Sequence, residues 1–397
     1  MPSKKRFFPA FIGATALVLA GSLSSCTTPS PTPTPPAAPP PAEAESLDMA
    51  MRSVVDKGAT AVVAQVRWPG GEWSKAYGVR DLDSRSPAQP GDRVSIASVT
   101  KTMTAVSVMK LVEDGLIELD DPVNDILQSF KTVLKPPRPI TVRQLLGHMS
   151  GMPPYQDAMF KTVDDILPAT KQRLSLQRGL QIAGTLPWEY VGNFRYSDSN
   201  YLALGQLLEK LRGKPYSQVL DDDIIKPLGL THTTVDDALD GAPDMIHGYI
   251  TIRGERAGGG PTPDQLGSPA HGVVSTTADV NTFLAALFQG KVVSPGSLEE
   301  MKKTNREPSI GLGLWKWSRD CTGAHRYGGR GGYLTYRTVA ISSADGRYQA
   351  TMTMVPPPLP SPLEDPEAEN KRDLWTDQLE SALLEALYGL CEESVPG

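Results

Sequence analysis

Residues 94–115 read VSIASVTKTMTAVSVMKLVEDG, and the interpretation of the whole chain begins here. The first residues are typical of a short extended segment. Apolar residues then recur with helical spacing up to Gly115, which is a stop signal for a helix. Ser98 and Lys101 are three positions apart, so they share one face of this helix with Cβ atoms about 5–6 Å apart. The lysine can therefore reach the serine hydroxyl.

A serine hydroxyl becomes a strong nucleophile only when a neighbouring group manages its proton. Burial would lower the pKa of the Lys101 ammonium and let it act as the base. The free N–H groups of a first helical turn would favour an oxyanion at Ser98. A catalytic serine and an ordinary N-cap or surface serine both fit this pattern.

The same S-x-x-K spacing recurs at Ser107 and Lys110. At about 100° per residue, Ser107 faces the opposite side of the helix from Ser98, and it lies where backbone N–H groups are already bonded. We interpret Ser107 as structural and Ser98 as the candidate nucleophile.

Strand patterns lie at both ends of the chain, with helical patterns between them. Val-rich and aromatic residues flank Pro69-Gly70-Gly71, which predicts a β-hairpin. The order of these patterns favours a mixed α/β layer that is split in sequence by a helical insertion. Strands are predicted at 58–69, 72–82, 93–98, 311–317, 335–343 and 347–355, and helices at 99–115, 200–213, 276–290 and 374–390.

Several ordered segments resemble the serine β-lactamases and the penicillin-recognising D-alanyl-D-alanine peptidases, especially the class C, carboxypeptidase and esterase branch. These segments are residues 95–127, 140–155 (ITVRQLLGHMSGMPPY), 194–233 and 268–287. The resemblance implies a β-lactamase/transpeptidase-like mixed α/β fold, in which an antiparallel sheet is flanked by helices. It assigns one hydrolase domain to 46–390, with the α/β part at about 46–119 and 268–390 and a helical insertion at about 120–267.

The resemblance also assigns roles to residues. Ser98 becomes the nucleophile, Lys101 its activating lysine, and Tyr196 a proton shuttle between the serine and the leaving group. Asp198 occupies the position where the family usually has Asn, so an acceptor replaces a donor to the substrate. Asp198 could pair with Lys101 in the pocket, or could cap the helix beginning near Asn200, and both interpretations stay open.

A third motif departs from the family pattern. The string Tyr327–Gly332, YGGRGG, places Gly329 where the family has His or Lys. The Gly332 N–H, on the strand with Gly331, would still complete an oxyanion hole with the Ser98 N–H. Arg330 could replace the missing charge only if a bulge turned it toward the site, because adjacent strand residues face opposite ways.

Two residues of the GHMSGMPPY loop also enter the prediction. Tyr155 begins a second loose match to the Tyr-x-Asn motif, and it is predicted to support or line the substrate pocket. His148 is predicted to fix the loop by hydrogen bonds rather than to act as a base. His271 and His325 are candidates for approaching the Gly329 position.

The N-terminus has the features of an export signal. Three basic residues precede an apolar run, and Leu23-Ser24-Ser25-Cys26 resembles a bacterial lipobox. Residues 1–26 are therefore predicted to be a lipoprotein signal peptide with Cys26 as the lipidated residue, the alternative being an uncleaved anchor. The proline-rich segment 27–45 is predicted to be an extended linker that holds the domain outside the cytoplasmic membrane.

Charge and composition exclude several partners. The net charge of −6 becomes −9 when residues 1–26, with three basic and no acidic residues, are removed, which argues against nucleic acid. The five histidines show no metal-ligand spacing, so neither a metal nor another cofactor is predicted. Cys321 and Cys391 could pair in an exported protein or stay free and buried.

Together these features predict an exported, lipid-anchored serine hydrolase that forms an acyl-enzyme. Its substrate would be an amide or ester: a D-Ala-D-Ala-type peptide of peptidoglycan, a small ester or a β-lactam. The alternative is a protein that keeps the fold but binds cell wall or a partner without catalysis, which Gly329 and Asp198 favour and Ser98, Lys101 and Tyr196 oppose.

Overall fold

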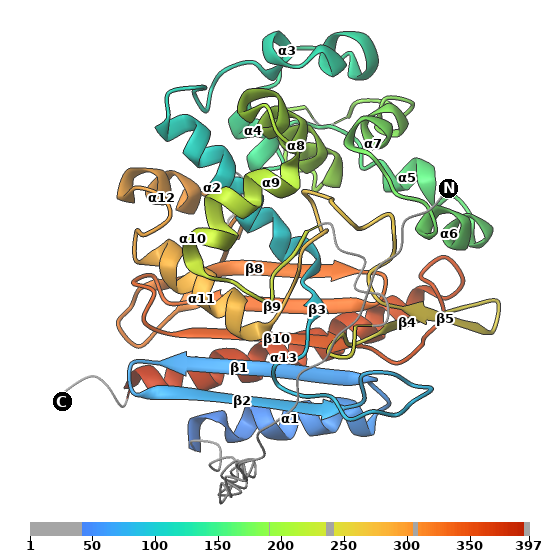
Figure 1. Ribbon diagram of the computed structural model, residues 1–397, viewed down its shortest axis with the longest axis vertical. Coiled ribbons are helices and arrows are strands. Elements are labelled where there is room, and N and C mark those ends of the chain that lie inside the picture. The colour runs from blue at the N-terminus through green and yellow to red at the C-terminus, as the bar shows by residue number, and fades with distance from the viewer. Residues whose placement is uncertain (1–41, 190, 236–241, 305–308, 393–397) are drawn as a thin grey trace, which may run out of the picture. The chain divides into compact units, whose positions relative to one another are not determined.

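The central element is a six-stranded antiparallel sheet in the order β2-β1-β10-β9-β8-β7 (Figure 1). The computed structural model describes residues 42–189, 191–235, 242–304 and 309–392. The first two strands come from the N-terminal part and the other four from the C-terminal part, as predicted. The strands are β1 (Ala61–Trp68), β2 (Gly71–Gly78), β7 (Trp315–Arg319), β8 (His325–Tyr333), β9 (Tyr336–Ser342) and β10 (Gln349–Val355).

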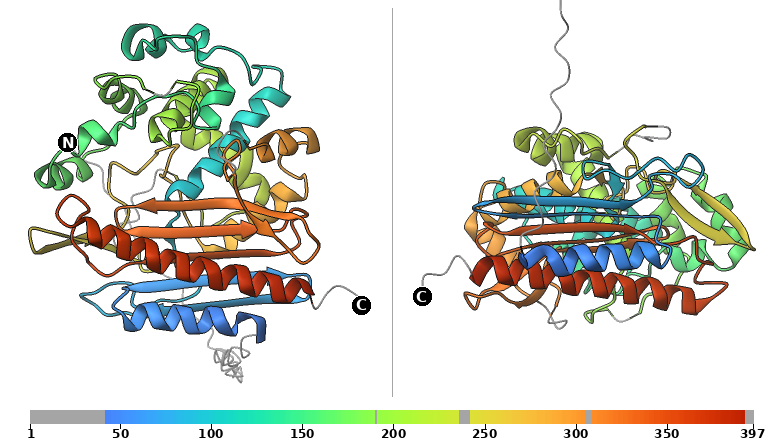
Figure 2. Two further views of the ribbon diagram at one scale, coloured as in Figure 1. Left: turned by 180° about the vertical axis from the view of Figure 1, so that it is seen from behind. Right: turned by 90° about the horizontal axis from the view of Figure 1, so that it is seen from below.

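The two faces of this sheet are covered by different helices (Figure 2). Helices α1 (Glu45–Asp56) and α13 (Pro366–Glu392) lie on one face. Helices α2 (Thr100–Glu113) and α11 (Thr277–Phe288) lie on the other. Alternate residues of each strand enter alternate cores, as strand geometry requires: Val62 belongs to the α1/α13 core and Val63 to the α2 core.

Helix α2 is buried on nearly every side, between the sheet and the helical part of the chain. Almost all residues from Thr100 to Leu111 are buried, including Ser107. A helix surrounded by protein needs no polar face, which explains why its sequence is apolar or small around its circumference. The amphipathic pattern predicted for this helix is therefore weaker than a surface helix would show.

The segment predicted as a helical insertion is mostly, but not wholly, helical. It also contains the hairpin of β4 (Gly248–Ile252) and β5 (Glu255–Gly259), which the sequence patterns missed. Its helices are α3 (Val123–Ile126), α4 (Val142–Leu146), α5 (Gln156–Met159), α6 (Val163–Thr170), α7 (Leu176–Ala183), α8 (Asp198–Arg212), α9 (Tyr216–Leu220) and α10 (Lys226–Leu228), with π-helical turns at Phe130–Leu134 and Asp221–Ile225. After it come α11 and α12 (Pro295–Lys302).

The pairing of two short strands places the loop at 268–273 beside the segment that carries Ser98. The predicted extended segment at 93–98 forms only the short strand β3 (Val94–Ser95), which pairs with β6 (Val274–Ser275). A 3₁₀ turn at Ala97–Val99 then leads directly into α2. The β3–β6 pairing brings residues 268–273, which are distant in sequence, next to the start of α2.

The limits of the domain differ from the prediction. Among the described residues, the first helical turn is a 3₁₀ turn at Ala42–Ala44, and Ala44 is fully buried, so the last residues of the predicted linker belong to the fold. The predicted signal peptide 1–26, Cys26 and the rest of the linker lie outside the described residues. Within the described ranges, no helix has the length and apolar content to cross a bilayer.

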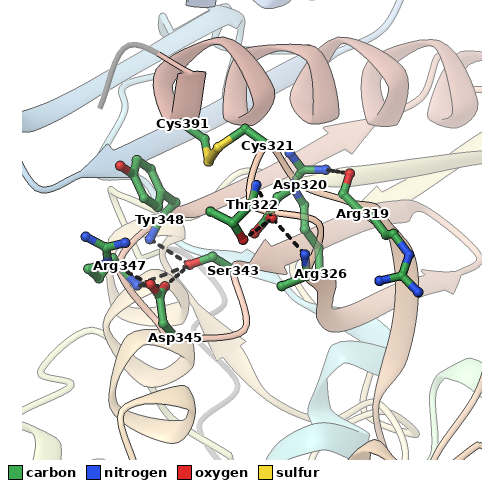
Figure 3. The surroundings of a disulfide bond; sticks show 11 residues. Arg319, Asp320, Cys321, Thr322, Arg326, Ser343, Asp345, Arg347, Tyr348 and Cys391 are labelled. Carbon is green, nitrogen blue, oxygen red and sulfur yellow. Dashed lines mark hydrogen bonds and ion pairs between the residues drawn. A yellow bond between two sulfur atoms is a disulfide. The ribbon is translucent and has the colours of Figure 1, made fainter. Parts of the chain in front are cut away.

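The end of α13 is joined to the β7–β8 connection by a disulfide bond between Cys321 and Cys391 (Figure 3). Their Cα atoms are 5.9 Å apart, which is within the usual range for a disulfide. Of the two alternatives from the sequence, this distance favours the paired one, and the pairing remains a proposal.

Candidate active site

Ser98 lies in the 3₁₀ turn between β3 and α2, on a backbone of unusual conformation. The preceding residue, Ala97, has φ = 45°, in the left-handed region that residues with a Cβ rarely occupy. Such strain is commonly stored at functional sites, where the surrounding structure maintains it. Ser98 itself is 9% exposed, so its hydroxyl is largely removed from solvent.

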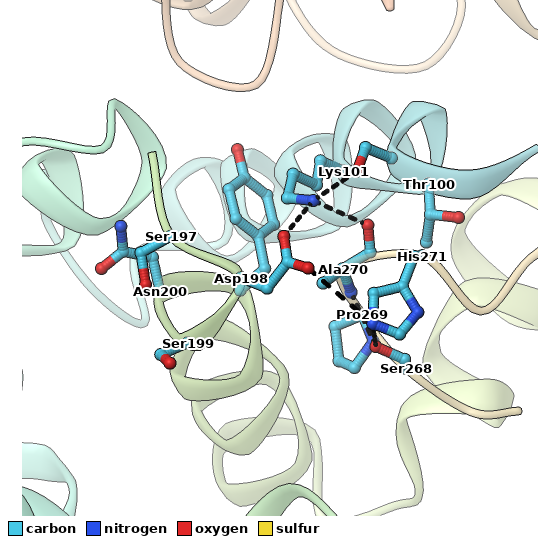
Figure 4. A network of polar contacts seen from close by, with 12 residues as sticks. Thr100, Lys101, Ser197, Asp198, Ser199, Asn200, Ser268, Pro269, Ala270 and His271 are labelled. Carbon is cyan, nitrogen blue, oxygen red and sulfur yellow. Dashed lines mark hydrogen bonds and ion pairs between the residues drawn. The ribbon is translucent and has the colours of Figure 1, made fainter. Parts of the chain in front are cut away.

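Lys101 lies at the centre of the polar contacts of the site (Figure 4). Its Nζ lies 2.8 Å from Ser98 Oγ and 2.9 Å from the carbonyl oxygen of Ala270. A third acceptor, Asp198 Oδ1, lies 2.7 Å away in a buried ion pair. The ammonium thus donates hydrogen bonds to Ser98 and to the Ala270 carbonyl, and Asp198 supplies the opposite charge beside it.

The charge state of Lys101 follows from these contacts. Burial is the largest single influence on the Lys101 ammonium and lowers its pKa, but Asp198 and Tyr196 together outweigh burial, so the pKa lies above its usual value. For Asp198, burial raises the pKa, but Lys101, His271 and Gln156 together outweigh it, so the pKa lies below the usual range. Both groups are therefore charged near neutral pH, and the Lys101 ammonium donates a hydrogen bond to Ser98 Oγ.

Asp198 is placed by the first turn of α8. Ser197 is the N-cap residue and the helix begins at Asp198, so the predicted capping role for Asp198 is wrong. Its side chain instead points across to Lys101, and its Oδ2 accepts a hydrogen bond from Gln156 Nε2. Gln156 was not predicted from the sequence as part of the site.

Tyr196 and His148 form a stacked pair beside Lys101. Their ring centroids are 4.2 Å apart, and Lys101 Nζ lies 4.9 Å from the centroid of the Tyr196 ring. Burial, reinforced by the Lys101 charge, lowers the pKa of His148 to about 3, so its imidazole is neutral. Its Nδ1 accepts a hydrogen bond from the Ser197 N–H at 3.2 Å. His148 therefore holds the Tyr196 loop in place.

His271 supports Asp198 from behind. It is fully buried, its Nε2 lies 3.9 Å from Asp198 Oδ2 and 3.0 Å from the Tyr155 hydroxyl, and its ring stacks on Tyr333 at 4.3 Å. Burial lowers the pKa of His271 to about 4. Tyr155 is also fully buried, so it supports His271 rather than lining an open pocket.

The other wall of the site is the backbone of β8. A Cβ on Gly331 would lie 2.7 Å from the Ser98 nitrogen and 2.8 Å from the Ile96 oxygen, so only glycine allows this close approach. Gly332 pairs with Arg337 two residues from a tight hairpin turn. The alternation of antiparallel bonding leaves the Gly332 N–H pointing away from β9. This is the orientation required of the second oxyanion donor.

Arg330 does not compensate for Gly329. Its Nη2 donates to Asp377 of α13 at 2.6 Å, on the face of the sheet opposite α2. The prediction that Arg330 binds substrate is corrected here: β8 has no bulge at this point, so Arg330 faces away from Gly329. His325 makes a hydrogen bond with the Trp317 carbonyl oxygen, and His271 lies beside Asp198. Neither histidine therefore replaces the side chain that is missing at Gly329.

The space left beside the serine is small. A cavity of ≈ 10 Å³ is lined by Ser98, Lys101, Tyr196 and the Ile310–Trp315 connection before β7. This volume suits about one water molecule. Among the described residues no group of His, Cys, Asp or Glu has the arrangement of a metal site.

Comparison with known proteins agrees with this geometry. The family model described as Beta-lactamase matches residues 47–358. Protein flp from Staphylococcus aureus (strain MW2) is 32% identical over 162 residues, which cover 41% of this chain and 32% of that protein. The chain therefore matches only about a third of that relative's length.

Solved structures resemble a larger part of the chain. A D-stereospecific amidohydrolase from Streptomyces sp. superposes with a TM-score of 0.69 at 27% identity, covering 78% of this chain and 94% of the other. A D-amino acid amidase from Ochrobactrum anthropi SV3, complexed with L-phenylalanine amide, gives 0.69 at 21% identity, covering 86% and 98%. With the family match extending over most of the described residues, the chain belongs to the beta-lactamase family.

Proposed function

We propose that this protein is a serine hydrolase that cleaves an amide or ester through an acyl-enzyme on Ser98. The observation that carries the proposal is the contact between Ser98 Oγ and the buried Lys101 ammonium at 2.8 Å. A buried lysine surrounded by three acceptors orients the serine hydroxyl and stabilises negative charge that develops on it.

The proton must then pass through Tyr196. Lys101 already holds its protons and cannot take another. As Oγ attacks the carbonyl carbon, the Ser98 proton therefore passes to the phenol oxygen while the phenol gives its own proton to the leaving nitrogen or oxygen, so that no protonated phenol forms. The bond to the leaving group then breaks with that proton in place. The Ser98 and Gly332 N–H groups would hold the oxyanion, and water, with its proton following the reverse route, would release the acid and restore Ser98.

The proposed substrate class follows from strand β8, which has no charged side chain at Gly329. No cationic side chain stands at Gly329, and Arg330 is directed to α13. A leaving group that carries a carboxylate would find no partner on this wall. Small esters and D-amino-acid or D-peptide amides are therefore the proposed substrates, ahead of efficient β-lactam turnover. The similarity to the D-stereospecific amidohydrolase from Streptomyces sp. supports this ranking.

The proposed location is the outer side of the cytoplasmic membrane. Its support is the sequence alone: the lipobox-like segment ending at Cys26 and the proline-rich residues that follow. A disulfide between Cys321 and Cys391 fits an oxidising compartment. We also propose that the bond forms in the exported protein.

The test is the intact mass of soluble 42–397 after exposure to a fluorophosphonate and, separately, to penicillin. Serine attack on phosphorus expels fluoride, so one phosphonyl adduct is expected on the wild type and none on Ser98→Ala. The fluorophosphonate should react faster than penicillin. A folded protein with no adduct from either reagent would favour the second candidate, a binding protein, which the ≈ 10 Å³ cavity and Gly329 support.

A further inference from the structure

Asp198 determines which way the amide of Gln156 points. A carboxylate can only accept hydrogen bonds, so the group that Gln156 directs to Asp198 Oδ2 must be its NH₂ donor. The carbonyl oxygen Oε1 of Gln156 therefore faces the other way. It is buried, and among the described residues it has no hydrogen-bond partner.

Asp198 provides buried acceptors close to the nucleophile, and Gln156 Oε1 is a further buried acceptor next to Asp198 in the hydrogen-bond network. Asp198 shares the Lys101 ammonium with Ser98, so the carboxylate lies one side chain away from the reacting hydroxyl. The two carboxylate oxygens offer about four acceptor positions in total, and Lys101, Gln156 and the more distant His271 leave some of them open. Gln156 Oε1 adds another.

The charges around these acceptors favour a donor ligand. The Lys101 charge is balanced by Asp198, and the neighbouring His148 and His271 are neutral. If the acyl group presented a carbonyl here, its oxygen would face the acceptor oxygens of Asp198 and Gln156. No hydrogen bond could form between them, and the buried acceptors would stay unpaired. A group with several N–H donors would satisfy them.

We propose that Asp198 and Gln156 form a specificity subsite for a free amino group on the acyl part of the substrate. This inference rests on the proposed function, since it places that amino group relative to the carbonyl attacked by Ser98. The preferred substrates are then amides or esters of amino acids or peptides with an unblocked amine, and N-acylated ones are rejected.

The test uses competition for the nucleophile. The rate at which a fluorophosphonate labels Ser98 is measured with increasing racemic alanine amide, N-acetylalanine amide and propionamide, which lacks the amine. Because a hydrogen bond to a charged group is worth about 1.5–3 kcal/mol, alanine amide is expected to protect at a concentration at least about tenfold lower than either competitor.

Two variants separate recognition from structure. Asp198→Asn allows the Gln156 amide to reverse, so the preference for the free amine should disappear even if labelling slows. Asp157→Asn makes the same chemical change on a half-exposed side chain that pairs with Arg195, and it should keep the preference.

Equal or better protection by N-acetylalanine amide, no protection by any of the three, or an unchanged preference in Asp198→Asn would each overturn the inference. Failure of the folded wild type to be labelled at all would instead contradict the proposed function. The two failures are thus distinguishable.

Discussion

The two walls of the active site are built in opposite ways. On the α2 and α8 side, side chains do the work: Lys101 joins Ser98 to Asp198 in a buried network. On the β8 side, Gly328–Gly332 present backbone, because Arg330 faces the other side of the sheet. Under the proposed function, the difference teaches that activation of Ser98 depends on charge, whereas oxyanion binding on the strand side depends on close packing of the backbone.

The largest expected effect comes from breaking the side-chain wall. Lys101→Ala should reduce the rate of fluorophosphonate labelling by about 10³-fold or more, since it removes the group that orients and polarises Ser98. It also leaves the Asp198 carboxylate buried without its counter-charge, which typically costs about 3–5 kcal/mol of unfolding free energy. Chemical denaturation and labelling kinetics measure the two effects.

The double variant Lys101→Ala/Asp198→Asn is the control. It should recover much of the lost stability, because no lone charge stays buried, and none of the lost labelling rate. Full recovery of labelling would show that Lys101 is not part of the chemistry.

One added methyl group on β8 is expected to disrupt the strand side of the site. Gly331→Ala would place a Cβ 2.7 Å from the Ser98 nitrogen and force β8 away from the 3₁₀ turn. Misplacing an oxyanion donor should lower the labelling rate by about 10²-fold. Gly329→Ala is the matched control, since its Cβ would meet Val99 Cγ1 only at 3.1 Å, and Thr102 Oγ1 and Val99 Cα at 3.3 Å. Equal losses in both variants would argue against the close packing as the cause.

The comparison is sharpened by adding charge to the bare wall. A Cβ on Gly329 would meet Val99 Cγ1 at 3.1 Å and Thr102 Oγ1 at 3.3 Å, contacts that small shifts relieve. Gly329→Lys should therefore fold and bring a cation to the strand, raising acylation by penicillin about tenfold, as one charge-assisted hydrogen bond would. Gly329→Ala, which adds the Cβ without the charge, should show no gain.

The neutral histidines behind the side-chain wall predict a dependence of the unfolding free energy on pH. His148 and His271 have pKa values of about 3 and 4 when folded, against about 6.5 when unfolded. Between these values the unfolded chain binds more protons, so the unfolding free energy falls as pH falls below about 6.5. Each histidine contributes at most about 1.4 kcal/mol per pH unit.

This pH dependence is measured by chemical denaturation between pH 7 and pH 4. His271→Gln should make the slope shallower by removing one of the two groups. A slope identical to that of the wild type would mean that His271 is not held neutral by burial.

Several features were predictable because they depend on neighbours in sequence. The β1–β2 hairpin and the end of α8 before Gly213 follow from local rules, and the structure confirms them. The β4–β5 hairpin was missed, because its short strands, ending in Gly258 and Gly259, lack a clear alternating pattern.

The residues of the site divide in the same way, into those that local spacing in the sequence predicts and those that it does not. Ser98 and Lys101 lie three residues apart on consecutive turns, so their spacing in sequence fixed their contact. His271 and Gln156 could not be assigned this way, since no local spacing relates either residue to Asp198. Their positions follow from the β3–β6 pairing and from the packing of the 151–159 loop against α8.

The sequence by itself thus determined the family, most of the strand and helix order, and the contact between Ser98 and Lys101, because each depends on residue types at short or ordered spacing. Only the tertiary structure decided the rest: Arg330 turns to α13, Lys101 is held as an ammonium, and Gln156 presents its carbonyl. Side-chain direction and charge state depend on which distant groups pack together, and that packing exists only in the folded chain.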